Sequence, residues 1–195
     1  HENELASPNV VPGGGGDIWP CKPNTETGLK ERGFEFLAEM ERLHMIVDVS
    51  HLSDRGFWDI AEHSTRPFAA SHSNCRALAP HCRNLTDEMI RVMAEKGGLV
   101  GLNYCSGFLD DQPRPELCRS TTALMARHAA HFKQVGGIEI IGLGSDFDGI
   151  GGKLEMGDCS KLPLLADALR KEGFTEDEVE QIFFRNAQRF FEENL

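Results

Sequence analysis

Short apolar segments alternate with longer amphipathic segments along most of this chain. The apolar segments span residues 45–50, 67–71, 98–104 and 138–145. They are apolar almost throughout, which is the pattern of strands buried on both faces of a parallel sheet. Each is followed by a segment with apolar residues at helical spacing, and one more such segment, residues 29–44, precedes the first strand. The pattern predicts an α/β fold built from four strand–helix units.

Capping residues mark the ends of the predicted helices. Three hydroxyl residues stand at the expected starts, namely Ser53, Thr86 and Thr175. Glu178 follows the last of these at the spacing of a capping box. The glycine pairs Gly97–Gly98 and Gly136–Gly137 are expected to end two helices, because glycine readily adopts the left-handed conformation found at helix ends. Both signals agree with the boundaries that the hydrophobic pattern predicts.

Residues 1–27 differ in composition from the remainder of the chain. This stretch is rich in glycine and proline, as in VVPGGGGDIWP, and such a composition does not propagate a helix or a strand. We expect an irregular arm or loop over residues 1–27 and a single domain over residues 28–195. Four strand–helix units form either an open sheet or one half of an eight-unit barrel, and the pattern alone leaves both possibilities open.

Charge and composition exclude several classes of function. The chain has 195 residues, with 31 acidic and 20 basic side chains and a formal net charge of −11. This balance argues against binding to nucleic acid, which needs a basic face, and against docking on an anionic membrane. No apolar run reaches transmembrane length, and the first residues lack the apolar segment of a signal peptide. Six cysteines without a CxxC pair predict reduced thiols in a cytoplasmic protein.

Three side chains with metal-binding or proton-transfer chemistry follow predicted strands. They are His51, His72 and Asp146, each at the carboxyl end of an apolar segment. Carboxyl ends of parallel strands form the active-site face of an α/β barrel, and neighbouring strands lie about 5 Å apart. Both imidazoles can therefore reach one metal ion or two adjacent ions. Alternatively, each histidine bonds a nearby backbone group, and the preceding Ser50 and Ser71 are strand-end hydroxyls or orient the rings.

Asp146 lies in the glycine-rich segment GLGSDFDGIGG. Glycines on both sides let the backbone approach a ligand, and a carboxylate at a strand end suits a general base or a proton shuttle. Asp148 is the competing candidate, but Asp146 is nearer to the strand end, and Asp148 can cap the loop instead. Arg83, in the loop before a predicted helix, can bind a substrate carboxylate in bidentate fashion, or it is a solvated loop arginine.

Two further patterns fit less well. Zinc-ligand chemistry also occurs in the set His72, Cys75, His81 and Cys82, but its spacing matches no standard structural zinc template. The glycine runs GGGG and GIGG lack the following Lys-Ser/Thr of a phosphate-binding loop. A structural zinc site is therefore the weaker alternative to a site at the strand ends.

Several motifs that occur in order also resemble a known family. The motifs are RLHMIVDVSHLSDRGFWDI, STRPFAASHSNCRAL, RNLTDEMI and IIGLGSDFDGIGG. They resemble the membrane (renal-type) dipeptidases and their bacterial relatives, which are zinc-dependent enzymes of the amidohydrolase-like barrel class. The similarity runs from Leu29 to the C-terminus. It implies that the chain corresponds to the C-terminal half of a TIM-type (β/α)8 barrel, with four βα units and an irregular N-terminal arm.

The resemblance implies a role for each of four residues. His51 and His72 match the histidines that bind the second metal of a binuclear zinc site. Arg83 matches the arginine that binds the carboxylate of the substrate's C-terminal residue. Asp146 matches the aspartate that contacts the substrate amine and takes part in proton transfer. The implied reaction is the metal-dependent hydrolysis of a dipeptide.

Parts of the family pattern have no counterpart in this sequence. The family's first strand carries a His-x-Asp metal pair and a later strand supplies a glutamate that bridges both metals, but no His-x-Asp occurs here. We expect the chain to start downstream of both segments, and we do not expect His1 to be the family's substrate-contacting histidine. Because two imidazoles are too few for a closed zinc site, the missing barrel half is expected to come from another chain or a second copy. The isolated chain is expected to be weak or inactive.

Two alternative functions stay open. A non-catalytic half-barrel that serves as an assembly module would bind no zinc at His51 and His72. Another metal-dependent barrel hydrolase, such as a deacetylase or a lactonase, would not demand the free carboxylate that Arg83 is expected to bind.

Overall fold

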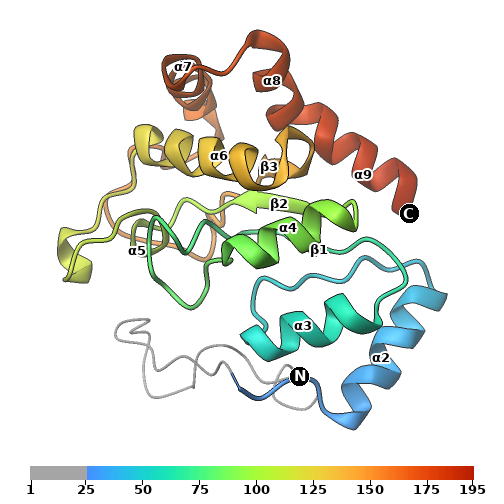
Figure 1. Cartoon of the computed structure of the whole chain (residues 1–195). Coiled ribbons are helices and arrows are strands. Elements are labelled where there is room, and N and C mark those ends of the chain that lie inside the picture. Colours follow the sequence, from blue (N-terminus) through green and yellow to red (C-terminus); the bar gives the residue numbers. More distant parts are fainter. Residues whose placement is uncertain (1–25) are drawn as a thin grey trace.

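The computed structural model describes residues 26–195 (Figure 1). The irregular arm predicted over residues 1–27 lies almost wholly outside the described residues and stays a prediction. Among the helices of the described part, none is long and apolar enough to cross a membrane.

Three short parallel strands form the centre of the molecule. They are β1 (Ala69–Ala70), β2 (Leu99–Leu102) and β3 (Ile141–Leu143), hydrogen-bonded in the order β1-β2-β3. Val100 is the register partner of Ala70 on one side and of Ile141 on the other. This is the predicted order of the second, third and fourth apolar segments, and the parallel pairing confirms the α/β class.

The first apolar segment, residues 45–50, lies beside β1 but pairs with it only briefly. Asp48 and Ala69 form a single parallel bridge. The amide of Ala69 donates to the Val47 carbonyl over 2.9 Å, and the amide of Val49 donates to the Ala69 carbonyl over 2.8 Å. The predicted strand therefore occupies its expected place at the edge of the sheet.

The predicted strand over residues 138–145 begins later than expected. Ile138–Ile140 form a 3-10 turn, η2, and Gly137 before it has a φ of 90°. Asn186 holds this turn, because its Nδ2 donates to the carbonyls of Ile138 over 2.7 Å and Ile141 over 2.9 Å. The hydrogen bonds of Asn186, which lies 45 positions from Ile141 along the chain, therefore override the preference of the local β-branched residues for a strand.

Helices surround the sheet, with α6 and α7 above it and α2 and α3 below it in the view of Figure 1. The α-helices are α2 (Glu31–Arg42), α3 (Asp54–His63), α4 (Asp87–Glu95), α5 (Ser106–Leu109), α6 (Thr122–Gly136), α7 (Leu162–Glu172), α8 (Glu176–Glu180) and α9 (Asn186–Asn194). Short 3-10 turns occur at η1 (Pro115–Leu117), η2 and η3 (Cys159–Lys161), and a π-helical turn, η4 (Gln181–Arg185), joins α8 to α9. α6 packs against both α4 and α7.

The expected capping residues form the expected hydrogen bonds. The Ser53 side chain accepts from the amide of Gly56, and the Thr86 side chain accepts from the amide of Met89. Thr175 and Glu178 form both bonds of a capping box. The sequence-based helix starts at these three positions are therefore confirmed.

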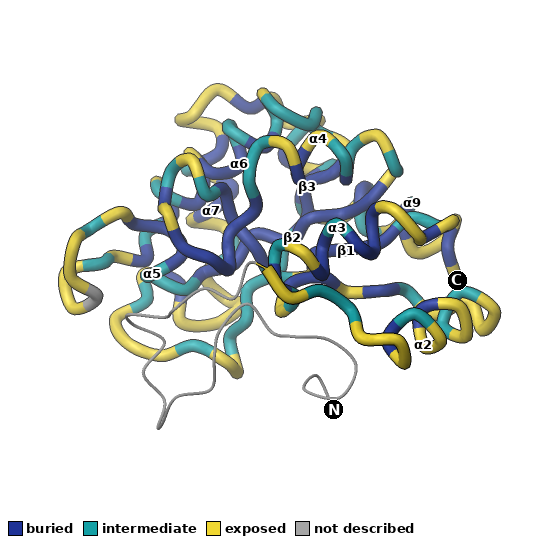
Figure 2. Tube along the Cα trace, turned by 60° about the horizontal axis from the view of Figure 1, so that its bottom comes forward, coloured by how far each residue is buried: buried dark blue, intermediate teal, exposed yellow. Residues whose placement is uncertain are grey.

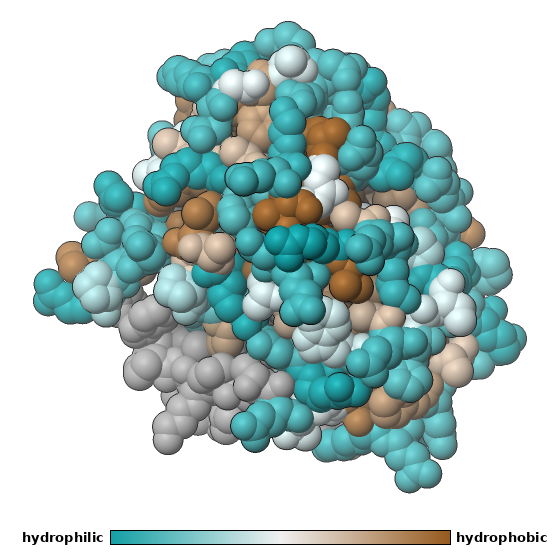
Figure 3. Space-filling model, viewed as in Figure 1, coloured by the Kyte–Doolittle hydropathy of each residue, from teal (hydrophilic) through white to brown (hydrophobic). Residues whose placement is uncertain are grey.

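The core lies between the sheet and the surrounding helices, where Figure 2 shows the strands in the colour of buried residues. Val100 and Leu102 of β2, Met93 of α4 and Phe132 of α6 have no solvent exposure. The outer surface seen in Figure 3 is mostly hydrophilic, with smaller hydrophobic patches between. This packing fixes the strand ends, and with them the loops that carry the candidate site.

Candidate functional site

The structure brings the two predicted metal-binding histidines into direct contact. Nε2 of His51 lies 2.9 Å from Nε2 of His72, and the ring centroids are 5.0 Å apart. His51 follows the edge segment that pairs with β1, and His72 follows β1 itself. Neighbouring strand ends therefore present two imidazole nitrogens to the same small volume, and His51 is exposed to solvent.

A network of hydrogen bonds lies behind the His72 ring. Ser71 Oγ is 2.7 Å from Nδ1 of His72 and donates to Oδ2 of Asp48 over 2.5 Å. Oδ1 of the same carboxylate accepts from the amides of Ser50, at 3.0 Å, and Ser71, at 2.9 Å. Ser50 Oγ accepts from the amide of His72 over 3.0 Å. Both serines that precede the histidines therefore bond to His72, rather than only ending their strands.

The surroundings of the His72 ring, and its burial above all, favour the neutral form of the imidazole. Burial lowers the pKa of His72, and the positive charge of Arg83 lowers it further, against the opposing effects of Asp146 and Asp48. For Asp48, the surrounding protein atoms act to raise the pKa, but hydrogen bonds from Ser71 and Ser50 lower it below its ordinary value. Neutral imidazole is the form that binds metal ions.

Asp146 is tied to the same rim through Asn103, which follows β2. Nδ2 of Asn103 donates to Oδ2 of Asp146 over 3.1 Å and lies 3.4 Å from the carbonyl oxygen of His72. Asp146 has a φ of 67°, in the left-handed region that is uncommon for residues other than glycine. A Cβ at Gly149 would lie 2.2 Å from Oδ1 of Asp146, so a larger residue there would displace the carboxylate. Asp148, the competing candidate, is exposed.

Arg83 lies in the loop between β1 and α4 and is 4% exposed. Its guanidinium carbon lies 5.5 Å from the centroid of the Phe108 ring. The backbone amide of Arg83 donates to Nδ1 of His81 over 3.1 Å. Its charge is close enough to lower the pKa of His72, so the arginine belongs to the same region as the histidines.

Arg76 holds the loop that carries Arg83. Its guanidinium forms two 2.7 Å contacts with the Asp54 carboxylate, and both side chains are partly buried, 23% and 21% exposed. The same guanidinium donates to the carbonyls of Asn84 over 2.8 Å and Cys82 over 2.9 Å. A single fork therefore joins the start of α3 to both residues that flank Arg83.

Three buried asparagines connect the loops at this rim. The backbone amide of Asn103 donates to the side chain of Asn74 over 3.1 Å, and the backbone amide of Asn74 donates to that of Asn84 over 3.2 Å. Asn74 and Asn84 each donate from Nδ2 to the carbonyl of Phe108, over 3.2 Å and 2.9 Å. The loops after β1 and β2 therefore form one rigid wall.

The alternative zinc site at His72, Cys75, His81 and Cys82 is not formed. Cys75 Sγ donates to the carbonyl of His128 over 3.4 Å, and His81 Nδ1 accepts from the amide of Arg83. Residues 26–195 contain no group of three or more His, Cys, Asp or Glu side chains placed to hold a metal ion. Within these residues, the paired imidazoles of His51 and His72 have no third metal-binding side chain beside them, and their role as metal ligands stays a prediction.

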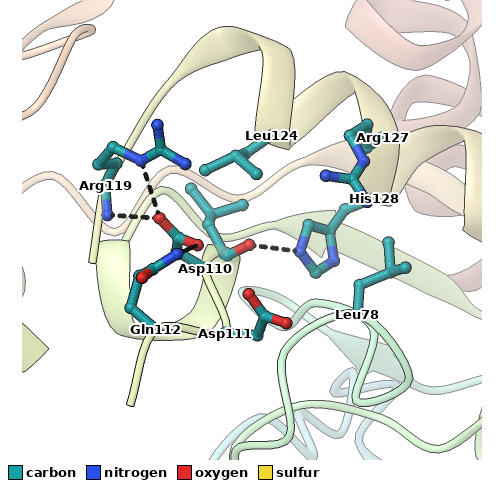
Figure 4. Close-up of a pocket in the computed structure, with 9 residues that line it drawn as sticks. Leu78, Asp110, Asp111, Gln112, Arg119, Leu124, Arg127 and His128 are labelled. Carbon is teal, nitrogen blue, oxygen red and sulfur yellow. Dashed lines mark hydrogen bonds and ion pairs between the residues drawn. The ribbon is translucent and has the colours of Figure 1, made fainter. Parts of the chain in front are cut away.

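A separate cavity of about 180 Å³ lies between α6 and the loop after α5 (Figure 4). At its base, Oδ2 of Asp110 accepts from the amide and from Nε of Arg119, each over 3.1 Å. His128 Nε2 donates to the Leu109 carbonyl over 3.1 Å. The predicted site residues do not line this cavity, and its buried polar groups are bonded to one another.

Sequence reasoning missed two residues of the rim. Asp48 and Asn103 each lie within a predicted apolar segment, and neither was named as a site residue. A polar residue interrupting MIVDVS was the available signal for Asp48, since a buried strand has no other need for a carboxylate.

Comparison with known proteins identifies a family. Residues 18–194 match the family model described as membrane dipeptidase, peptidase family M19. A protein from the pqqA 5′ region of Klebsiella pneumoniae is 38% identical over 171 residues, which cover 88% of this chain and 63% of that protein. An uncharacterized dipeptidase of Schizosaccharomyces pombe is 35% identical, over 84% of this chain and 39% of that protein.

Solved structures resemble the fold. A metallo peptidase from Rhodobacter sphaeroides, liganded with a phosphinate mimic of the dipeptide L-Ala-D-Ala, has a TM-score of 0.83 and 35% identity, over 91% of this chain and 50% of that one. The probable dipeptidase PvdM from Pseudomonas aeruginosa, with 18% identity and a TM-score of 0.85, shares the fold over 98% of this chain and 60% of its own. This chain spans about half the length of these solved chains.

Proposed function

Because this chain belongs to the membrane dipeptidase family, peptidase family M19, we propose that it forms part of a metal-dependent dipeptidase. The observation that carries the proposal is the meeting of His51 and His72 at 2.9 Å, beside an Asp146 carboxylate held by Asn103. Imidazoles and a carboxylate at one strand-end rim are the groups that metal-assisted hydrolysis needs.

The two histidines fit a shared metal ion in their chemistry and nearly in their spacing. Zinc binds nitrogen at about 2.0–2.1 Å, so two ligands at a tetrahedral angle lie about 3.3 Å apart. The two Nε2 atoms, now 2.9 Å apart, need to separate only slightly to meet this requirement. We propose zinc as the metal. Zinc sites take three or four protein ligands, so the remaining ligands must come from polypeptide outside residues 26–195.

We propose that Arg83 binds the carboxylate of the substrate and that Asp146 binds its amine. The Arg83 guanidinium is desolvated at one wall of the site, where a bidentate pair with a carboxylate is strong. The Asp146 carboxylate approaches from the β3 end of the rim. Recognition of both charged termini would restrict substrates to dipeptides. The relative crystallised with a mimic of L-Ala-D-Ala supports this class of substrate.

In the proposed reaction, Asp146 carries the proton. Its carboxylate accepts a proton from the attacking water and delivers it to the leaving nitrogen, while Asn103 keeps one carboxylate oxygen oriented. Arg83 fixes the substrate at its C-terminal end. When bound, the metal supplies Lewis-acid chemistry that polarises the peptide carbonyl.

We further propose that the strand–helix units are one half of a TIM-type barrel, completed by polypeptide from elsewhere in the protein or by a partner. The likeness to solved dipeptidase chains about twice this length supports this arrangement. Metal binding and turnover are then expected to be weak in residues 26–195 alone.

The test compares free and blocked dipeptides in the zinc-loaded, complete enzyme that contains this chain. L-Ala-L-Ala and L-Ala-D-Ala are expected to be hydrolysed, and their N-acetyl or C-amide derivatives are not. Arg83→Ala is expected to raise KM for free dipeptides, whereas Arg91→Ala, at an exposed position on α4, is the matched control. Faster turnover of blocked substrates would favour a deacetylase or lactonase. Absence of both zinc and turnover would favour the assembly module.

A further inference from the structure

The hydrogen bonds of Ser71 Oγ place the two protons that link Asp48 to the ring of His72. The Asp48 carboxylate is an acceptor only, so the short contact with Ser71 Oγ requires the serine hydroxyl to donate to Oδ2. The hydroxyl proton is then unavailable to the ring. Ser71 Oγ must accept from His72, and the 2.7 Å contact therefore places a proton on Nδ1 of His72.

A neutral imidazole carries one ring proton, so Nε2 of His72 is left with a lone pair. That nitrogen is the one that lies 2.9 Å from Nε2 of His51. The backbone that carries the ring is held as well, because Ser50 Oγ accepts from the backbone amide of His72 and the Asp48 carboxylate accepts from the amide of Ser71. Asp48 and the two serines therefore set the ring tautomer and hold the backbone of His72 in place.

We propose that Asp48 and Ser71 are positioning residues that hold His72 in the tautomer protonated on Nδ1 and so present its Nε2 as a metal ligand. The inference rests on the proposed function for the identity of the ligand, but the tautomer itself follows from the hydrogen bonds alone. Partners of this kind, which bond the second nitrogen of a ligand histidine, commonly strengthen metal binding.

An Asp48→Asn variant gives a sharp prediction, since the two side chains have nearly the same shape. Oδ1 of Asp48 accepts from two backbone amides, so the single oxygen of asparagine must stay at that position. The new NH2 group then faces Ser71 Oγ and donates to it. Ser71 turns its own proton toward Nδ1 of His72, and the ring proton moves to Nε2, where it blocks the metal-binding position.

The experiment measures the tautomer directly in the metal-free chain. Long-range ¹H–¹⁵N correlation spectra of histidine-labelled protein at about pH 8, where the rings are neutral, distinguish protonated from unprotonated ring nitrogens. The His72 signals are assigned by their loss in His72→Gln. We expect protonated Nδ1 in the wild-type chain and protonated Nε2 in Asp48→Asn. Asp111→Asn removes the same charge at an exposed position after α5 and is expected to leave the tautomer unchanged.

A pair of serine variants tests the same point if Asp48→Asn does not fold. Ser71→Ala is expected to abolish the tautomer preference, and Ser71→Thr, which keeps the hydroxyl, to restore it. In the complete enzyme that contains this chain, zinc titration monitored on the His72 signals is expected to show about 10- to 100-fold weaker binding in Asp48→Asn and Ser71→Ala.

A wild-type ring protonated on Nε2, or a tautomer indifferent to both Asp48→Asn and Ser71→Ala, would overturn the proposal. In the complete enzyme that contains this chain, a His72 that has the expected tautomer and does not respond to zinc would instead overturn the metal-binding function. The two failures are therefore distinguishable.

Discussion

Nδ2 of Asn103 lies 3.1 Å from Oδ2 of Asp146, and this bond joins the end of β2 to the end of β3. Asn103 has no solvent exposure, and its own Oδ1 accepts from the amide of Cys105 over 2.6 Å. The side chain therefore cannot turn away from Asp146 without leaving a buried backbone donor unsatisfied. Asp146 takes its orientation from this amide.

An Asn103→Leu variant keeps the number and branching of the side-chain heavy atoms and removes the hydrogen bonds of the side chain. We expect the free energy of unfolding to fall by about 3 kcal/mol, because the Cys105 amide loses its acceptor. In the complete enzyme, kcat is expected to fall about 10- to 100-fold as Asp146 loses its orientation. Steady-state kinetics and chemical denaturation measure the two effects. The matched control is Asn194→Leu, at a buried position in α9, which should affect stability alone. Unchanged kcat in Asn103→Leu would contradict the role given to Asn103.

The backbones of three strands meet closely below the histidines. A Cβ at Gly101 would lie 2.1 Å from the carbonyl oxygen of Ser71, and a Cβ at Gly144 would lie 2.0 Å from the same atom. Gly101→Ala is therefore expected to displace the Ser71 backbone and to cost about 3 kcal/mol of stability. Gly151→Ala, where no atom lies within 4 Å of the added Cβ, is the control and should be nearly neutral. Thermal denaturation measures the stability of both variants, and equal melting temperatures would contradict the close packing.

The partly buried Arg76–Asp54 pair can be compared with an exposed pair to test how burial changes the stability that a bidentate contact contributes. Arg76→Lys keeps the charge but loses the fork, and we expect a loss of about 2 kcal/mol together with a raised KM, because the loop carrying Arg83 loosens. Arg42→Lys removes the equally short fork to Glu39, but that pair is 66% and 54% exposed. Its loss is expected to leave the free energy of unfolding almost unchanged, because solvent screens an exposed pair. Denaturant titrations of both variants provide the measurement, and similar losses would show that burial makes no difference here.

His128 makes stability depend on pH. Burial lowers the pKa of His128 to about 4, from 6.5. Between these two values the unfolded chain binds a proton at this residue that the folded chain does not, so stability rises with pH across the interval and is fully present above about 6.5. The expected change is about 3 kcal/mol from pH 6.5 to pH 4. Denaturant unfolding as a function of pH should lose most of this slope in His128→Gln. Ring signals of His128 that titrate near pH 6.5 in the folded protein would contradict the assignment.

The sequence predicted the elements well because the signals that define them are local. The caps at Ser53, Thr86 and Thr175 depend on residues within three positions, and apolar runs mark the strands. The start of β3 was predicted too early, because Asn186 of α9 holds Ile138 in a 3-10 turn. That bond depends on tertiary packing, which no local pattern contains.

The candidate site also contains residues that local patterns predict and residues that depend on tertiary packing. His51 and His72 could be named because each directly follows an apolar run, and the parallel order of those runs brings them together. Asp48 was missed, because its contact with Ser71 depends on the register between the edge segment and β1. Register is set by side chains along the whole sheet rather than by the residues in contact.

His128 joins parts of the molecule that are far apart in sequence. Its Nδ1 accepts from the amide of Cys75 over 3.1 Å, while its Nε2 donates to the carbonyl of Leu109. The Cys75 amide proton is therefore shielded from deuterium exchange only while the imidazole stays between the two loops. Deuterium uptake at this single amide reports each transient opening of the wall that carries Arg83, and at low pH its protection relative to a free amide should fall as the ring takes up a proton and ceases to accept.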